Sequence, residues 1–286
     1  MLVIAALVPD TALLVPGAAG RAVVLEDVRA AALAAVGEAL GIAPDRVVVV
    51  APGTVDRVLT GPVRASLAAA GMDDARLGWG RPDRALTQPL AGPRPAPAVP
   101  ASTALLVLAQ LGWTGPTTVV EVASPAPALG APPLGSGRAG RADGARASAL
   151  QSLGADLVGG GDRVAFVVAG SLSARNGPRA PLAQDGRAAL LDSSVLADLA
   201  SSDAGARRRL AATSGSLAAE LAMTAWAPLQ VLLGAAAGAP EITSGAVHRS
   251  APFGVTYVVA LWRVGGAPVV GVGAAPAWSA LPGATP

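Results

Sequence analysis

Residues 2–8 (LVIAALV) form a continuous apolar run that ends at Pro9, the pattern of a strand covered on both faces. Apolar side chains then recur at helical spacing over residues 22–40, and Gly41 is a natural helix stop. A second buried strand follows at residues 46–51 (RVVVVA). Strand, helix and strand within about 50 residues are typical of a βαβ unit. This stretch therefore predicts a parallel sheet.

The rest of the chain adds elements to such a sheet. Strand patterns recur at residues 117–122 and 163–169, and three short segments near the C-terminus (244–249, 254–263 and 267–273) have the pattern of antiparallel strands. Helical spacing is found at residues 62–70, 101–111, 143–158, 187–200, 203–211 and 215–235. We therefore predict one α/β domain over residues 1–286. It is a three-layer α/β/α sandwich with a mixed, mainly parallel central sheet and an antiparallel C-terminal addition.

Proline and glycine mark the expected interruptions. Prolines are frequent over residues 82–100, and residues 124–142 (SPAPALGAPPLGSGRAGRA) are rich in both proline and glycine. We predict extended surface chain for both segments, each a candidate surface for a protein partner. Pro228 should kink or split the helix at residues 215–235 because its ring and missing N–H disturb a helix interior.

Composition restricts the chemistry available. The chain has one histidine, His248, and no cysteine, so a disulfide framework, a zinc–thiolate site and a thiolate nucleophile are excluded. All basic residues are arginines, which explains a pI near 10.2 at a net charge of only +2. They form one short run, Arg207-Arg208-Arg209, so a nucleic-acid partner is not indicated. The N-terminus lacks the basic flank of a signal peptide, and no apolar run is long enough to cross a bilayer. We expect a cytoplasmic protein with no membrane partner.

Two familiar motifs are not supported by their surroundings. Residues 135–140 (GSGRAG) match G-x-G-x-x-G, but a dinucleotide site needs this turn directly after a strand, and Pro132-Pro133 precedes it here. A Ser-His-Asp hydrolase would need His248 as its base, yet His248 lies in a strand-like segment and no G-x-S-x-G elbow is present. The first motif is interpreted as a loop, and His248 as a strand residue.

Polar residues follow the predicted parallel strands, where open α/β sheets place ligands. Asp10 and Thr11 follow the first strand, and Pro52-Gly53-Thr54 follows the second. The strand at 163–169 runs into Gly170, and then come the candidate pocket residues Ser171, Ser173 and Arg175. Together they supply a carboxylate, several hydroxyls and a guanidinium able to hold an anion in a bidentate fork. They predict a pocket for a small polar or anionic ligand, although each polar group could instead cap a helix or turn.

Three segments resemble the class III extradiol ring-cleavage dioxygenase superfamily. The similarity is to its catalytic-subunit-B-like (LigB-like) proteins of actinobacteria, and the Memo proteins share the superfamily. Residues 1–16 resemble the family's opening strand, and residues 169–175 with 191–199 resemble its glycine-serine-histidine loop and the following helix. Residues 217–262 resemble its C-terminal helix and strands, including Glu220, Trp226-Ala227-Pro228, Pro252-Phe253-Gly254 and Tyr257.

The resemblance implies this α/β fold and, in active members, an iron(II) site. Asp10 stands where the family has its first iron histidine, and Ala51-Pro52-Gly53 stands where the second is expected. Ala174 stands at the family's acid/base histidine, and Glu220 falls near the iron-binding glutamate. Because a non-heme iron(II) site is usually two histidines and one carboxylate, we expect no iron cofactor here.

Three functions remain open. The first is a non-catalytic protein that binds a small polar or anionic ligand, or that acts as a partner subunit or homo-oligomer. The second is a metal-dependent oxidoreductase of the superfamily with an altered site built from Asp10, Glu220 and His248. Its two carboxylates could hold a hard cation such as Mg²⁺. The third is an interaction protein that uses one of the two proline-rich segments.

Overall fold

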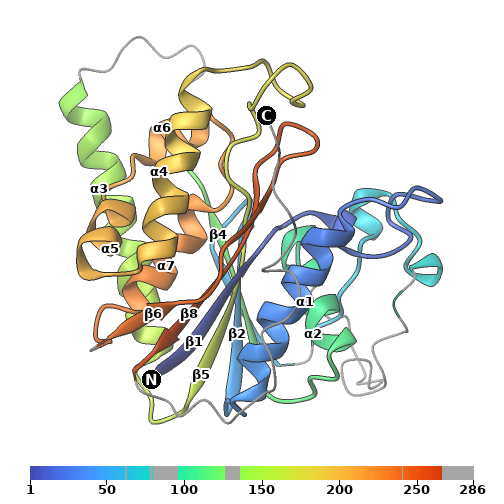
Figure 1. The fold of residues 1–286 in the computed structure, drawn as a ribbon. Coiled ribbons are helices and arrows are strands. Elements are labelled where there is room, and N and C mark those ends of the chain that lie inside the picture. The colour runs from blue at the N-terminus through green and yellow to red at the C-terminus, as the bar shows by residue number, and fades with distance from the viewer. Residues whose placement is uncertain (62, 78, 80–95, 126–135, 240, 266–286) are drawn as a thin grey trace.

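The structure is a computed structural model of residues 1–286, and it describes residues 1–61, 63–77, 79, 96–125, 136–239 and 241–265. A central sheet runs through these residues, with helices packed on both of its faces (Figure 1). The predicted three-layer α/β/α arrangement is confirmed. Within the described residues, none of the helices combines the length and the apolar character that crossing a bilayer requires.

Four parallel strands form the middle of the sheet. They are β1 (Leu2–Val8), β2 (Arg46–Gly53), β4 (Thr117–Ala123) and β5 (Val164–Ala169), in the spatial order β4-β2-β5-β1. β5 lies between β1 and β2, so the first βαβ unit skips one strand position. All seven residues of β1 and all six of β5 are buried, as the continuous apolar runs predict.

Antiparallel strands complete the sheet at both edges. β3 (Arg57–Thr60) pairs with β4 at one edge. At the other edge β8 (Tyr257–Val264) pairs with β1, and the short strands β6 (Ile242–Ser244) and β7 (His248–Ser250) pair with β8. The predicted antiparallel C-terminal addition is therefore confirmed for two segments, one of which forms two short strands. The third, residues 267–273, lies outside the described residues.

Alternate side chains of the strands enter two cores. On one face α1 (Glu26–Gly41) and α2 (Val99–Gln110) cover the sheet, and Val47, Val49 and Val167 point into this core. On the other face lie α3 (Ser136–Leu157), α4 (Arg187–Ser201), α5 (Ala204–Ala211), α6 (Gly215–Glu220) and α7 (Trp226–Ala235). Figure 1 shows the two helical layers on opposite sides of the strands.

Two glycines allow α3 and α7 to pack backbone to backbone. A Cβ atom added at Gly154 of α3 would lie 1.9 Å from the Val231 carbonyl oxygen, and one at Gly234 of α7 would lie 1.9 Å from the Gln151 carbonyl oxygen. No larger residue fits either position without moving a helix. This contact holds α3 and α7 together on the sheet.

Four local predictions were wrong. Residues 136–142 belong to α3 rather than to the loop at 124–142, because alanine and arginine between the glycines favour a helix. The helix predicted at 62–70 is reduced to a 3₁₀ turn at Ala68–Ala70. There the Asp74 carboxylate accepts the Leu67 N–H, and the Ser102 hydroxyl accepts the Ser66 N–H. Side chains thus replace helical partners for these N–H groups.

The helix predicted at 215–235 breaks elsewhere than at Pro228. Residues 221–225 separate α6 from α7, and Pro228 lies in the first turn of α7, where its missing N–H has no helical partner to lose. The proline-rich segment predicted at 82–100 also ends early, since Val99 and Pro100 begin α2. Residues 82–95 of that segment lie outside the described residues.

Candidate functional site

The carboxyl ends of the four parallel strands meet at one edge of the sheet, and the chain leaves neighbouring strands toward opposite faces. After β1 and β2 it continues to the side of α1 and α2, whereas after β4 and β5 it continues to the side of α3–α7. In open α/β sheets, ligands bind outside the carboxyl ends of the strands at such points. Charged or hydroxyl side chains come together at two of them, one beyond the ends of β1 and β5 and one beyond the ends of β2 and β4.

Asp10 and Ser171 meet beyond the ends of β1 and β5, as predicted. The Ser171 hydroxyl, on a residue that is 4% exposed, donates a hydrogen bond to Asp10 Oδ1 at 2.5 Å. Asp10 itself is half-buried. Within the described part of the chain, no arginine or histidine nitrogen lies within 4.0 Å of the Asp10 carboxylate. Its charge therefore faces neutral hydroxyls rather than a counter-ion.

Thr11 and Tyr257 complete this group. Thr11 Oγ1 accepts the Leu13 N–H at 3.3 Å. Burial raises the pKa of Tyr257, the Thr11 side chain opposes this shift, and the negative charge of Asp10 adds to it. Tyr257 therefore stays protonated at neutral pH. We call Asp10, Thr11, Ser171 and Tyr257 the Asp10 crevice.

The segment that carries Ser171 is fixed by the chain on the side of α7. The Ser171 N–H donates to Thr224 Oγ1 at 2.9 Å, and the Ser171 carbonyl accepts the Ala225 N–H at 3.0 Å. Gly170 makes this approach possible, because a Cβ atom there would lie 2.5 Å from Ala225 Cα. The position of Ser171 is thus set by backbone contacts as well as by its bond to Asp10.

The hydrogen bonds of Ser173 stabilise the loop that follows β5 and do not involve Asp10. The Ser173 N–H donates to Asp192 Oδ1 at 3.0 Å, and its hydroxyl donates to the Leu221 carbonyl at 3.2 Å. Asp192, on α4, is 1% exposed, and its Oδ2 accepts the Asn176 amide at 2.5 Å. The same amide nitrogen donates to Thr256 Oγ1 at 2.9 Å. This buried network holds residues 173–176 between α4 and the start of β8.

Arg175 and Glu220 take part in a separate charged group. Arg175 Nη1 donates to the Ala183 carbonyl at 2.9 Å. Glu220 forms an ion pair with Arg187 at 2.9 Å, and Arg187 also binds Asp185 at 2.7 Å. Hydrogen bonds from Arg187 hold the pKa of Asp185 at about 2. The structure joins neither Arg175 nor Glu220 to Asp10 by a hydrogen bond or ion pair within the residues it describes.

His248 lies on β7, and its Nε2 is 3.3 Å from the Asp27 carboxylate of α1. The contacts that the structure gives to Asp10, Glu220 and His248 thus have no partner in common. Among the described residues, no group of three or more histidine, aspartate or glutamate side chains could hold a metal ion. These three residues do not fit the two-histidine, one-carboxylate set of a non-heme iron site.

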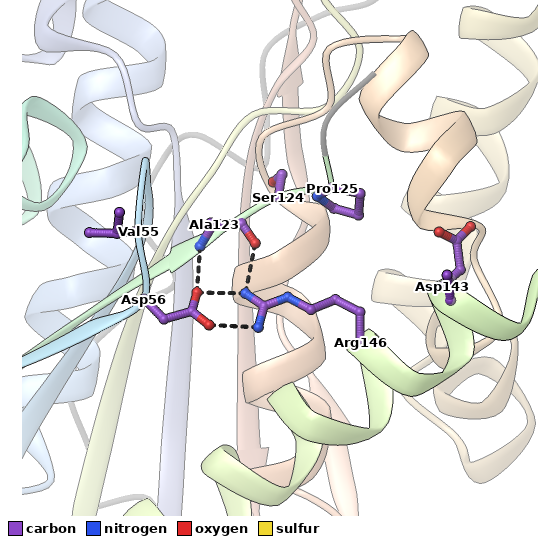
Figure 2. A pocket seen from close by; sticks show the side chains of 8 residues that line it. Val55, Asp56, Ala123, Ser124, Pro125, Asp143 and Arg146 are labelled. Carbon is purple, nitrogen blue, oxygen red and sulfur yellow. Dashed lines mark hydrogen bonds and ion pairs between the residues drawn. The ribbon is translucent and has the colours of Figure 1, made fainter. Parts of the chain in front are cut away.

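A pocket of about 490 Å³, shown in Figure 2, lies beyond the ends of β2 and β4. It lies between the turn after β2, the chain that follows β4, and the N-terminal half of α3. Its walls are mainly apolar, with charged side chains on one side. The lining residues are Val55, Asp56, Ala123, Ser124, Pro125, Ala142, Asp143 and Arg146.

An ion pair forms one side of this pocket. Arg146 donates to both carboxylate oxygens of Asp56 at 2.6 Å, and its Nη2 also donates to the Ala123 carbonyl at 2.8 Å (Figure 2). The Ala123 N–H donates to Asp56 Oδ1 at 2.8 Å, which closes the network. The hydrogen bond from Arg146 lowers the pKa of Asp56 despite an opposing effect of burial. Asp56 is therefore a carboxylate whose charge is compensated.

The pocket residues were not predicted from the sequence, although part of the signal was present. Pro52-Gly53 was identified as a strand end, and Asp56 follows three residues later. Asp143 and Arg146 are three apart, the spacing of one helix face, and this could have indicated a polar face at the start of α3. The contact between Asp56 and Arg146 spans 90 residues, which no local pattern reveals.

Comparisons with known proteins identify no family for this chain. No protein-family model matches it, and no curated protein matches it. Among solved structures, it is similar to the crystal structure of uncharacterized protein JW3007 from Escherichia coli K12, with 14% sequence identity and a TM-score of 0.45. That match covers 91% of this chain and 99% of the other.

Proposed function

We propose that the protein binds a small polar ligand at the Asp10 crevice and does not catalyse a reaction there. The observation that carries this proposal is the state of Asp10. It is a half-buried carboxylate at a strand-end crevice, with a serine hydroxyl at 2.5 Å and no arginine or histidine nitrogen within 4.0 Å in the described chain. A carboxylate partly removed from water needs hydrogen-bond donors or a positive charge. A ligand with hydroxyl or amino groups supplies them.

The rigidity of the crevice supports ligand binding. The Thr224 hydroxyl accepts the Ser171 N–H and the Ala225 N–H donates to the Ser171 carbonyl, so Ser171 is fixed. Groups that are already in place lose little conformational entropy when a ligand arrives, so more of the contact energy appears as affinity. The Asp10 crevice thus combines a half-buried carboxylate with a serine hydroxyl whose position is fixed.

The charge of the crevice favours a ligand with donor groups over an anionic ligand. The anionic alternative depended on Arg175, whose Nη1 is bound to the Ala183 carbonyl in a different part of the loop. An anion placed beside Asp10 would meet a like charge without a compensating guanidinium. We therefore propose neutral polyhydroxylated compounds and primary amines as the ligand classes.

The non-catalytic part of the proposal comes from the residues at the sheet edge. We propose that the chain is a divergent LigB-like protein in which Asp10, Ala174 and the turn at Pro52-Gly53 replace the imidazoles of active relatives. A cytoplasmic location, and assembly as a homo-oligomer or partner subunit, belong to the same proposal. The check is anaerobic loading with iron(II), followed by addition of catechol in air-saturated buffer, which supplies the dioxygen that ring cleavage consumes: ring opening at an appreciable rate contradicts the non-catalytic assignment.

Ligand binding is tested by thermal shift and calorimetry on a panel of neutral polyols, primary amines and monocarboxylates. We expect a polyol or an amine to bind, and Asp10→Asn to weaken that binding about tenfold, since a hydrogen bond to a charged group is typically worth 1.5–3 kcal/mol. Asp156→Asn is the matched control, because Asp156 is exposed on α3. Binding that survives Asp10→Asn unchanged, or a preference for monocarboxylates, contradicts the proposal.

A further inference from the structure

The 490 Å³ pocket between β2 and β4 is separate from the Asp10 crevice in both its residues and its charge. Its lining contains none of Asp10, Thr11, Ser171 or Tyr257. Pockets for small molecules are typically about 300–1,000 Å³, lined mainly by apolar groups with a few fixed polar ones. Val55, Ala123, Pro125 and Ala142 supply apolar walls, and three charged side chains supply the polar part (Figure 2).

Asp143 is held in place by the start of α6. Its Oδ2 accepts hydrogen bonds from the Ser214 hydroxyl at 2.9 Å, from the Ser216 N–H at 2.9 Å and from the Ser216 hydroxyl at 3.0 Å. All three donors bind the same carboxylate oxygen. Oδ1 accepts no hydrogen bond within the described residues, so it remains able to receive a donor.

The charges of the pocket do not balance. Arg146 is engaged with Asp56 through two hydrogen bonds, so these two side chains neutralise each other. Asp143 has no arginine or histidine nitrogen within 4.0 Å in the described part of the chain. The lining residues that the structure describes therefore carry one excess negative charge, and that charge is located on Asp143.

We propose that this pocket binds a small organic cation, namely a protonated primary amine attached to a compact apolar body. The ammonium group donates to Asp143, and the apolar body packs against Pro125 and Ala142. An ammonium–carboxylate hydrogen bond is stronger than a neutral one, and the apolar walls reduce its competition with water. An anion of the same shape is disfavoured, because the guanidinium of Arg146 is already bound to Asp56.

Benzylammonium, benzyl alcohol and benzoate test this assignment because they share one ring and differ in charge. Calorimetry on the full-length protein at pH 7 should show that benzylammonium binds at least tenfold more tightly than either of the others. Equal binding of benzoate, or no binding of benzylammonium, overturns the proposal.

Two variants locate the binding. Asp143→Asn removes the charge while keeping an oxygen for Ser214 and Ser216, and it should weaken benzylammonium binding about tenfold. Ala142→Phe fills the pocket from an exposed helix position and should abolish binding, with circular dichroism confirming the fold. Wild-type affinity in either folded variant overturns the proposal.

Asp156→Asn is the matched control, and it should bind benzylammonium as the wild type does, because Asp156 is exposed elsewhere on α3. If Asp10→Asn abolishes binding and Asp143→Asn does not, the amine occupies the Asp10 crevice instead. That result contradicts the second site while supporting the proposed function. Failure of the Asp10 ligand test leaves the benzylammonium test intact, because the two sites have no residue in common.

Discussion

The Asp10 crevice and the pocket beside Asp56 occupy equivalent places in the fold but differ in the group that binds their carboxylate. Each lies at the carboxyl ends of two neighbouring parallel strands whose connections diverge. Asp10 is bound by the Ser171 hydroxyl, whereas Asp56 is bound by the Arg146 guanidinium through two hydrogen bonds. The strand topology thus places both carboxylates at strand ends. Residues that are distant in sequence decide whether a carboxylate is neutralised by an arginine or keeps a charge that a ligand can bind.

The loop beside the Asp10 crevice depends on a buried carboxylate, so its removal has the largest expected effect. Asp192→Ala leaves the Ser173 N–H without its acceptor and leaves the Asn176 amide with Thr256 Oγ1 alone. We expect the free energy of unfolding to fall by about 3 kcal/mol or more, since hydrogen bonds to charged groups are typically worth 1.5–3 kcal/mol each. Urea unfolding measures the change. A loss below about 1 kcal/mol would show that the network does not hold the loop.

Alanine substitutions at Gly170 and Gly53 measure how tightly the chain is packed beside the Asp10 crevice and beside the pocket. At Gly170 a methyl group meets the Ala225 backbone at 2.5 Å, whereas at Gly53 it meets Glu121 Cβ at 2.9 Å. We expect Gly170→Ala to lower the free energy of unfolding by about 2 kcal/mol and Gly53→Ala by about 1 kcal/mol. Gly144→Ala is the control, because nothing lies within 4 Å of its added methyl group and alanine favours a helix. The reverse order at 170 and 53 would contradict the packing described here.

The ion pair in the pocket should make a smaller contribution that depends on pH. Both partners are partly exposed, so we expect Arg146→Met to cost about 1 kcal/mol or less at pH 7. Because Arg146 lowers the pKa of Asp56 in the folded protein, the contribution is present above the unfolded value near 3.9 and is lost as the pH falls through the folded pKa. Urea unfolding at pH 7 and pH 3 should show the difference between wild type and variant shrinking in acid. A difference that grows in acid would contradict this assignment.

The smallest effect is on the titration of Tyr257, which reports directly on the Asp10 crevice. Tyr257 is the single tyrosine of the chain, so ultraviolet absorbance follows its ionisation alone. Burial raises its pKa above the ordinary value near 10, and the charge of Asp10 adds to this shift. Asp10→Asn should lower the pKa of Tyr257 toward the ordinary value, whereas Asp143→Asn should not change it. Identical titrations of wild type and Asp10→Asn would place Asp10 away from Tyr257.

The buried strands and their order along the chain were predictable because the sequence pattern that indicates each strand is local. Runs such as LVIAALV and RVVVVA are apolar on both faces, and few structures other than a covered parallel strand accept them. β3 was missed because Arg57–Thr60 is short and lies at the sheet edge, where its side chains alternate between half-buried and exposed. The 3₁₀ turn at Ala68–Ala70 was predicted as a helix because Asp74 and Ser102, not the local sequence, decide its hydrogen bonds.

The candidate site was likewise predictable only where its residues lie close to the end of a strand. Asp10 and Ser171 directly follow adjacent strands, so the strand-end rule brings them together. Arg175 and Glu220 lie farther along a loop and a helix, and their positions depend on Ala183 and Arg187. The bond between Asp56 and Arg146 depends on the turn after β2 and on the packing of α3 against α7. Residues close to a strand end can be placed from sequence, while those several residues away require the tertiary structure.

The most direct test of ligand binding at the Asp10 crevice is an amide ¹H–¹⁵N NMR titration with the tightest-binding polyol or amine of the panel. We expect the largest shifts to fall on Thr11, Ser171 and Tyr257 and to disappear in Asp10→Asn. Shifts confined to Asp56, Asp143 and Arg146, or shifts that persist in Asp10→Asn, would contradict this expectation.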